Sequence, residues 1–371
     1  MKADEKEKGL AQAADDGRVK WRGVFGELRE GLRDGAFPQD TPLPSERALC
    51  RKYGISRITV VRVMDELRKQ GLVCRRRGSG TFATKLARAE AGRLGLICPS
   101  LAFGEIFAPI CQSLARFAQQ DGYSFVFGDI SSPQPSRRAH EACKVARMFV
   151  EQGVAGVVLQ PLAFLKTPAR VTREILTLFA EADIPVVLVD RDIEQTDVPH
   201  DFVGIDNLAA GRALGAHLLA RGARRIHFLM RPNCASVIRD RLDGVMSALG
   251  ADRPKNAVIV AEPTDVAALE PWFRRRPRPD AVICESDYVA AQFRNTLDRF
   301  GLSVPKDVRL AGFDDIRCAV STPPPLTTVH QPCEDLARMV YQTLLDRMRD
   351  PSLPARRILL GAPLVIRDST R

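Results

Sequence analysis

Two helical patterns of apolar residues stand near the start of the chain, on either side of Gly54. The first predicted helix covers residues 46–53 and follows Ser45, whose hydroxyl can accept a backbone N–H bond as an N-cap. The second follows Ser56 and ends at Gly71. One face of this second helix carries four apolar residues at helical spacing, namely Val60, Val63, Met64 and Leu67. The sequence therefore predicts a helix-turn-helix.

A basic hairpin follows the helix pair. Residues 72–74 and 81–83 are short runs that predict two strands. The segment 75–80 between them reads RRRGSG, which supplies glycines for a tight tip and arginines for phosphates. In such units the N-terminal residues of the second helix meet base edges in the major groove. This stretch therefore predicts DNA binding, with Arg57 as the best candidate for a bidentate guanine contact.

Strands and helices alternate after a polar linker at residues 85–93. The pattern first predicts strands at 94–98, 124–127, 156–159 and 185–190, and helices at 107–120, 140–152 and 171–182. It then starts again with strands at 203–205, 225–230, 257–260, 281–284 and 309–312, and with helices at 207–220, 239–249, 266–273 and 288–300. Such alternation is typical of doubly wound sheets, so we expect two similar α/β lobes in series.

The distribution of charge agrees with DNA binding. The chain has a formal net charge of +10, and residues 18–88 hold 17 Lys and Arg against 7 Asp and Glu, which is the same excess. Because these side chains neutralise phosphates and release counterions, DNA affinity is expected to fall steeply with salt. A membrane surface would also attract basic charge, but these residues lie in a capped helix pair rather than on one amphipathic helix.

The remaining composition narrows the class of protein. The 9 cysteines and 5 histidines show no metal-ligand or nucleophile spacing, so we expect free thiols in a reducing compartment, no metal and no cofactor. Residues 1–17 are charged and lack the apolar core of a signal peptide, and no run approaches a membrane span. We therefore expect a disordered lead-in and a cytoplasmic protein without a membrane partner.

Polar residues follow several of the predicted strands. Asp190 and Arg191 follow one strand, Asp287 and Asp314 follow two others, and Arg241 opens a helix. Ligands of open parallel sheets bind at the carboxyl ends of the strands, here in a cleft between the lobes. Carboxylates and guanidinium groups gathered there suit a ligand with many hydroxyl groups, because each can form two hydrogen bonds.

The segments LPSER, YGISR, DEL, QGLV and GSGTF, in this order, closely resemble the winged helix-turn-helix of the GntR family over residues 18–84. The resemblance implies that Arg47, Arg57 and Gly80 lie at the DNA and that Thr59 contacts a phosphate. The chain departs from the family at Arg62, which is displaced by one position, about 100° around the helix. The candidate DNA contacts are Ser45, Arg47, Ser56, Arg57, Ile58, Thr59, Arg62, Arg77, Gly78 and Gly80.

The segments VDR, VGIDN, RLDG, DAVICESD, GFDD and STPPPLTTVHQP resemble the effector domain of LacI/GalR-type repressors, itself built like periplasmic sugar-binding proteins. The resemblance makes four of the polar residues above ligand contacts, and it lets the loop 103–107 place an aromatic face over a sugar ring. The candidate ligand contacts are Phe103, Phe107, Asp190, Arg191, Arg241, Ser286, Asp287 and Asp314. Glu285 and Ser286 stand where the family often has other residues, so the identity of the ligand does not carry over.

Together, the resemblances imply an α/β chain with an N-terminal winged helix-turn-helix and a two-lobed, doubly wound, periplasmic-binding-protein-like domain. The expected boundaries are a lead-in at 1–17, a DNA-binding domain at 18–84, a linker at 85–93 and an effector-binding domain at 94–371. This arrangement is similar to the arabinose-responsive hybrid regulators of the GntR family. It implies a homodimer that binds an inverted repeat of operator DNA and responds to a small-molecule effector, with a sugar as the first hypothesis.

Several alternatives stay open from the residues alone. In one alternative, Asp314 caps a helix and Arg241 pairs with Asp240 or Asp243, and neither residue contacts a ligand. Asp206 is better explained as an N-cap than as a ligand contact. The leading hypothesis is a repressor released by a carbohydrate, and the alternative is a purine-responsive or ligand-independent regulator. An α/β enzyme is a distant alternative, because no GxSxG, P-loop or GxGxxG motif is present.

Overall fold

The N-terminal domain folds around the two capped helices that the sequence predicts. Residues 23–32 are helical, and α2 (Glu46–Tyr53) and α3 (Arg57–Lys69) follow, with β1 (Val73–Arg76) paired antiparallel to β2 (Gly80–Ala83). The predicted apolar stripe of α3 is buried. One detail differs, since Gln70 is the C-cap of α3 and Gly71 is the next residue, with a left-handed φ of 68°. The winged helix-turn-helix is confirmed.

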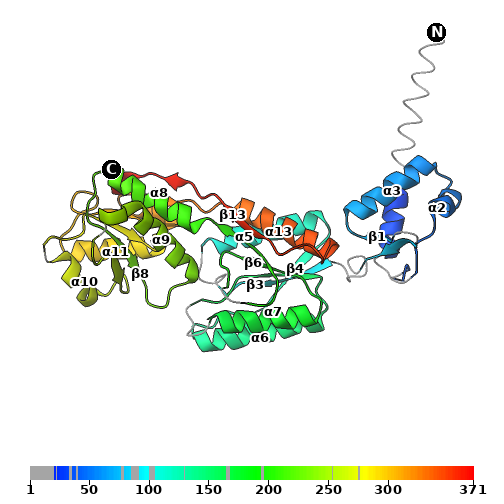
Figure 1. Cartoon of the computed structure of the whole chain (residues 1–371), viewed down its shortest axis with the longest axis horizontal. Coiled ribbons are helices and arrows are strands. Elements are labelled where there is room, and N and C mark those ends of the chain that lie inside the picture. Colours follow the sequence, from blue (N-terminus) through cyan, green and yellow to red (C-terminus); the bar gives the residue numbers. More distant parts are fainter. Residues whose placement is uncertain are drawn as a thin grey trace, which may run out of the picture.

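The computed structural model describes residues 21, 23–32, 36–38, 41–76, 79–84, 92–99, 105–128, 130–163, 168–193, 196–252, 254–274 and 276–371. Figure 1 shows the N-terminal domain at one end of the molecule, a first α/β lobe in the middle and a second at the other end. We call these the DNA-binding domain, lobe 1 and lobe 2. Among the described residues, no helix combines the length and apolar character needed to cross a bilayer.

Lobe 1 is built on a parallel sheet with the strand order β13-β7-β6-β5-β3-β4. Its strands are β3 (Arg93–Ile97), β4 (Ser124–Phe127), β5 (Gly156–Leu159), β6 (Val186–Val189), β7 (Asp201–Ile205) and β13 (Arg357–Leu360). One hydrophobic cluster joins this sheet to α5 (Phe107–Gln120) and α13 (Cys333–Arg349), and a second joins it to α6 (Pro135–Glu151) and α7 (Pro168–Glu181). Helices thus cover both faces, as Figure 1 also shows.

Lobe 2 has a smaller parallel sheet in the order β11-β10-β8-β9. Its strands are β8 (Ile226–Met230), β9 (Val258–Val260), β10 (Ala281–Cys284) and β11 (Arg309–Ala311). One cluster packs this sheet against α8 (Asn207–Ala220) and α9 (Ser236–Leu249), and another packs it against α10 (Val266–Phe273), α11 (Asp287–Arg299) and α12 (Arg317–Ser321). A short pair, β12 (Thr328–Val329) and β14 (Leu364–Val365), completes the lobe.

The chain does not finish lobe 1 before it starts lobe 2. The sequence placed residues 203–205 at the start of the second lobe, but β7 pairs with β6 in the first sheet. After lobe 2, the chain returns through α13 and β13, and β13 pairs in parallel with β7. The expectation of two lobes in series is therefore wrong, because strand pairing between distant segments leaves no local pattern. The chain passes between the lobes three times.

Candidate functional site

The first turn of α3 is the exposed edge of the DNA-binding domain. The Ser56 hydroxyl caps this helix by accepting the Thr59 N–H at 3.2 Å. Ile58 is 83% exposed although it is apolar, and the Arg57 side chain is 81% exposed. Arg57 contacts Glu46 at 3.2 Å, an exposed ion pair that costs little to break. The side chains of Arg57 and Ile58 are therefore free to enter the major groove of DNA.

Several other predicted DNA contacts have intramolecular neighbours. The Arg62 guanidinium stacks 4.7 Å from the centre of the Trp21 ring, which gives the displaced arginine a packing role. The Thr59 and Ser56 hydroxyls are hydrogen-bonded to each other at 2.9 Å. Gly80 has a φ of 115°, which favours glycine at the start of β2. Ser45 caps α2, Arg47 is exposed beside it, and Arg77 and Gly78 lie outside the described residues.

Arg241 is the centre of the polar network in lobe 2. It lies within α9, not at its start, and is only 3% exposed. Its guanidinium donates to Asn207 Oδ1 at 2.8 Å, to the Glu285 carbonyl at 2.7 Å and to Asp314 Oδ1 at 3.2 Å. The same group stacks 4.6 Å from the centre of the Phe313 ring. These contacts hold the guanidinium in one orientation, and they contradict the alternative that it pairs only with its helix neighbours.

Asp314 presents its carboxylate from a strained backbone position. Its φ is 107°, in the region that non-glycine residues rarely adopt. Besides Arg241, the carboxylate accepts a hydrogen bond from Gln331 Nε2 at 2.9 Å. Asp314 does not cap α12, whose N-cap is Ile316. Strain of this kind persists where the surroundings hold a residue in place, so it points to a role for the carboxylate.

A second polar network lies at the carboxyl ends of the lobe 1 strands. Asp190, directly after β6, has a left-handed φ of 73° and is 8% exposed. Its carboxylate accepts a hydrogen bond from Arg191 Nε at 3.0 Å and one from Gln160 Nε2 at 3.3 Å. Gln160 directly follows β5 and is fully buried. Three neighbouring polar groups thus form one wall.

The two polar walls approach the same point between the lobes. Cys333, at the start of α13, has its pKa raised to about 11 by burial and then by the Asp314 and Asp190 carboxylates, so both groups lie near it. The lobes also touch directly, because the Arg317 backbone N–H of lobe 2 donates to Glu105 Oε2 of lobe 1 at 3.2 Å. We call the set formed by Gln160, Asp190, Arg191, Arg241 and Asp314 the interlobe site.

Two predicted ligand contacts have structural roles, and a third has a capping role. Phe107 is 3% exposed and packs in the hydrophobic core of lobe 1, which corrects the prediction of an aromatic platform there. Asp287 is fully buried and accepts hydrogen bonds from Thr328 Oγ1 at 2.6 Å and from the Ile316 N–H at 3.2 Å, so it supports the Asp314 loop. Ser286 caps α11. Phe103 lies outside the described residues.

Asp287 gives the protein a testable dependence on pH. Burial, followed by the nearby Asp314 carboxylate, raises the pKa of Asp287 to about 8. An unfolded Asp has a pKa of about 3.9, so between these values the folded state holds a proton that the unfolded state has lost. Stability is therefore expected to fall as the pH rises, by on the order of 2 kcal/mol between about pH 6 and pH 9.

Thermal unfolding at several pH values measures this effect. Asp287→Asn is expected to flatten the profile, whereas Asp265→Asn, at the exposed N-cap of α10, is expected to leave it unchanged. An Asp287→Asn profile as steep as that of the unmodified protein would assign the pH dependence to another group.

Comparison with known proteins agrees with both the winged helix-turn-helix and the two-lobed domain. Residues 21–83 match the family described as bacterial regulatory proteins, gntR family. Residues 216–370 match the periplasmic binding protein-like domain. The chain combines a GntR-family DNA-binding domain with a periplasmic-binding-protein-like domain. The first match covers the described winged helix-turn-helix. The second covers most of lobe 2, together with α13 and β13 of lobe 1.

Curated relatives match this chain along most of their length. The arabinose metabolism transcriptional repressor of Halalkalibacterium halodurans is 24% identical over 95% of this chain and 96% of its own. The HTH-type transcriptional regulator reg1 of Streptomyces lividans is 28% identical over 87% of this chain and 95% of its own. These relatives are named as transcriptional regulators, and with its gntR-family domain this chain is a DNA-binding transcriptional regulator.

Solved structures show the same fold. A transcriptional regulator CelR–cellobiose complex has a TM-score of 0.64 at 23% identity, and the match covers 88% of this chain and all of that one. A LacI-type regulator from Alkaliphilus metalliredigens, complexed with D-xylulofuranose, has a TM-score of 0.62 at 20% identity over 75% of this chain and 99% of its own. At these identities, the likeness establishes the architecture of this chain.

Sequence reasoning missed four polar residues that the fold brings to the interlobe networks. Gln160 and Arg231 each directly follow a strand, so the rule that found Asp190 would also have found them. Arg231 donates to Glu285 Oε1 at 2.7 Å. Asn207 and Gln331 gave no such signal, because the first begins a helix and the second lies in a connection between the lobes.

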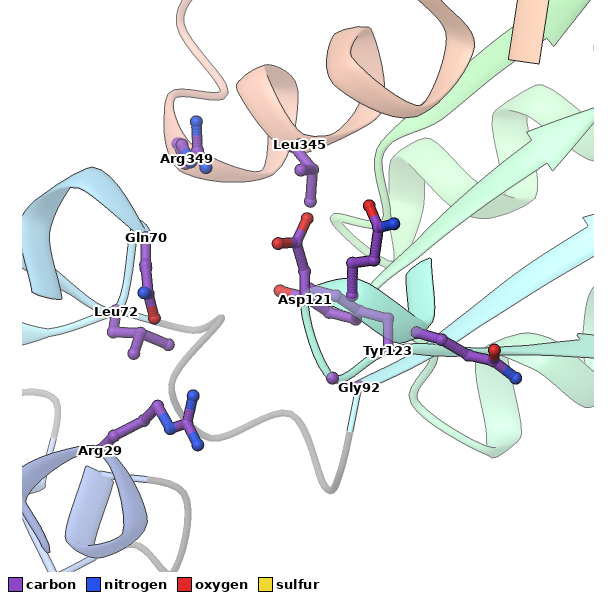
Figure 2. Close-up of a pocket in the computed structure, with 11 residues that line it drawn as sticks. Arg29, Gln70, Leu72, Gly92, Asp121, Tyr123, Leu345 and Arg349 are labelled. Carbon is purple, nitrogen blue, oxygen red and sulfur yellow. The ribbon is translucent and has the colours of Figure 1, made fainter. Parts of the chain in front are cut away.

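A cavity of about 340 Å³ lies where the GntR-family domain meets lobe 1. Figure 2 shows Arg29 and Gln70 on one side of it, Asp121 and Tyr123 on the other, and Arg349 of α13 above it. Asp121 also accepts a hydrogen bond from Tyr341 of α13 at 2.8 Å, and burial, followed by this bond, raises the pKa of the phenol. None of the described lining residues belongs to the interlobe site, so the cavity marks a domain junction.

Proposed function

We propose that this regulator is a repressor that leaves its operator when a small carbohydrate binds between lobes 1 and 2. The observation that carries the proposal is the buried Arg241–Asp314 pair, which lies near Asp190 and the groups that surround it. A sugar presents many hydroxyl groups at fixed angles, and a preorganised set of guanidinium, carboxylate and amide groups can bond several of them at once. The cellobiose and xylulofuranose complexes named above, and the arabinose repressor, support this ligand class.

The proposed DNA complex uses the exposed first turn of α3. Arg57 and Ile58 reach base edges, Thr59 and Ser56 approach the backbone, and Arg47 neutralises phosphate. Two chains form a homodimer on an inverted repeat, with half-sites about 34 Å apart or a multiple of that distance. The protein acts as a binding protein rather than as an enzyme, and it works in the cytoplasm, where the chromosome lies.

The coupling between effector and DNA follows from two features. The hydrogen bond from the Arg317 N–H to Glu105 joins the lobes in this structure, so a ligand that closes or separates them changes this contact. Helix α13 begins at Cys333 near the interlobe site, and its residues Leu345 and Arg349 line the junction with the DNA-binding domain. Its 17 residues span about 25 Å, which makes it a rigid link between the two regions. The effector must bind one lobe arrangement more tightly than the other.

The test of the proposal begins with an operator obtained by in vitro selection from random DNA. Fluorescence anisotropy then measures operator affinity with and without pentoses, hexoses, uronic acids, sugar phosphates, disaccharides and purines. We expect one carbohydrate to weaken operator binding by about tenfold or more, within the usual range of allosteric coupling. An effect from purines alone would establish the purine-responsive alternative, and the absence of any effect would establish a ligand-independent regulator.

Arg57 is expected to carry sequence recognition. Arg57→Ala should cost about 1–3 kcal/mol of operator binding and relax specificity at one base pair. The matched control is Arg68→Ala, which removes the same charge from the other end of α3, where Arg68 pairs with Asp65 at 2.9 Å. The measurement is anisotropy on the selected operator and on single-base variants. Equal losses for the two variants would reduce Arg57 to a phosphate contact.

A further inference from the structure

Three loops at the amino edge of the lobe 2 sheet carry basic residues. Residues 224–225 directly precede β8, residues 274–280 read RRRPRPD and precede β10, and Lys306 lies just before β11. Because these three strands are parallel neighbours in the sheet, the three loops meet at one edge. Arg231 and Glu285, which belong to the interlobe networks, follow β8 and β10 at the opposite edge. The basic loops are therefore separate from the interlobe site.

Hydrogen bonds join the three loops to one another. The Asp280 carboxylate accepts the backbone N–H of Arg224 at 3.1 Å and that of Arg225 at 2.8 Å. Arg225 Nε donates to the Arg278 carbonyl at 2.6 Å, and Arg278 Nη2 donates to Asp307 Oδ1 at 2.8 Å. These bonds hold the loops in place before any ligand arrives, so a ligand bound here would lose little free energy to their ordering.

Positive charge exceeds negative charge at this edge. We define the basic platform as its five cationic side chains, namely Arg224, Arg225, Arg276, Arg278 and Lys306. Two carboxylates, Asp280 and Asp307, lie among the five, so an excess of three positive charges remains. Arg276 is exposed and forms no ion pair or hydrogen bond with another described residue. Since the charges of the chain outside residues 18–88 balance, this excess is a local concentration of charge.

A pocket of about 440 Å³ opens among these side chains, which is within the usual size of small-molecule sites. Its lining residues are Arg225, Arg276, Pro277, Arg278, Pro279 and Asp307. The three guanidinium groups carry N–H donors in planar forks, which match the paired oxygens of a phosphoryl group. One phosphoryl group carries a charge of about −1.5 to −2 near neutral pH, so two linked groups match the excess charge of the basic platform.

We propose that the basic platform is a second ligand-binding site of this regulator and that it binds a small molecule with a diphosphate group. Arg276 supplies the guanidinium that has no intramolecular partner, while Arg225 and Arg278 are held in position by the bonds between the loops. Figure 1 shows lobe 2 at the end of the molecule opposite the DNA-binding domain, so operator DNA held by α3 lies away from this pocket. The site therefore takes a small phosphorylated ligand rather than the operator, and it does not depend on the proposed sugar.

Isothermal titration calorimetry of the full-length protein with pyrophosphate tests the proposal. Arg276→Gln removes an exposed guanidinium, so the protein should fold normally, and pyrophosphate binding is expected to weaken by about tenfold or more. The matched control is Arg239→Gln, an exposed arginine of α9, which should leave the affinity unchanged. Sulfate, which offers a single tetrahedral group, should bind more weakly than pyrophosphate. Equal affinity of the unmodified protein and Arg276→Gln, or equal affinity for the two anions, would contradict the proposed site.

Hydrogen–deuterium exchange locates the bound anion, because the DNA-binding domain also attracts negative charge. With pyrophosphate, we expect slower exchange in residues 274–280 and 303–309, and the Arg276→Gln protein should lose this protection. Protection confined to residues 57–80 would assign the binding to the DNA-binding domain and overturn the proposal. Protection of residues 274–280 by duplex DNA, without any by pyrophosphate, would replace the small ligand with nucleic acid.

Discussion

Replacing Arg241 with methionine is expected to abolish the response to effector and to destabilise lobe 2 by about 3–5 kcal/mol. Arg241 is 3% exposed and donates to three different acceptors, and its removal leaves the Asp314 carboxylate without the guanidinium charge, beside the Gln331 amide that donates to it. Methionine keeps most of the volume, so the loss comes from charge and hydrogen bonding rather than from a cavity. Thermal unfolding and the operator assay measure the two effects.

Two further variants separate the loss of stability from the loss of binding. Arg239→Met changes an exposed arginine two positions earlier on α9 and is expected to leave both measurements unchanged. The double variant Arg241→Met with Asp314→Asn removes the unpaired charge, so it should regain part of the stability while the effector response stays absent. If Arg241→Met kept an intact effector response, the assignment of Arg241 to the interlobe site would be wrong.

The DNA-binding domain was readable from the sequence because its signals are local. A serine before each helix, a glycine after it and an apolar stripe at helical spacing lie within a few residues of one another. The structure reproduces both helices with their serine N-caps and buries all four stripe residues of α3. What Arg62 contacts was not readable, because its stacking partner Trp21 lies 41 positions earlier in the chain.

The lobes were predictable element by element but not in their connection. Residues 107–120, 124–127, 156–159, 207–220, 266–273 and 281–284 have the predicted bounds. Helix α6 begins at Pro135, five positions earlier than expected, because proline is favoured in the first helical turn. The membership of β7 and the return of α13 and β13 to lobe 1 depend on pairing between strands far apart in sequence. No local pattern encodes such pairing.

The interlobe site was partly predictable because the strands themselves were predictable from local sequence. A polar residue directly after a buried strand must lie at the carboxyl end of the sheet, and this rule led to Asp190 and Arg191. It cannot say whether a carboxylate faces a ligand or supports a loop, and Asp287 does the latter. The prediction of an aromatic platform at Phe107 was wrong because an aromatic residue at the start of a helix can face the core as easily as a ligand.

Gly211→Ala is expected to destabilise the protein by about 3 kcal/mol or more, although it adds a single methyl group. A Cβ atom at Gly211 of α8 would lie 2.1 Å from the Arg241 carbonyl oxygen of α9, far inside contact distance. The close approach is reciprocal, since a Cβ at Gly244 of α9 would lie 2.1 Å from the Leu208 carbonyl oxygen of α8. The two helices must therefore separate by about 1 Å to accept either methyl group.

The same separation should weaken effector binding, because the atom that the new methyl group displaces belongs to the backbone of Arg241 itself. The matched control is Gly26→Ala, in the helix at residues 23–32, where a Cβ meets nothing within 4 Å. Alanine there is expected to be neutral or stabilising by up to about 1 kcal/mol, since it lowers the entropy of the unfolded chain. Thermal unfolding of both variants, with the operator assay on Gly211→Ala, provides the measurement. If Gly211→Ala matched Gly26→Ala in stability, then the tight contact between α8 and α9 would not be what positions the Arg241 guanidinium.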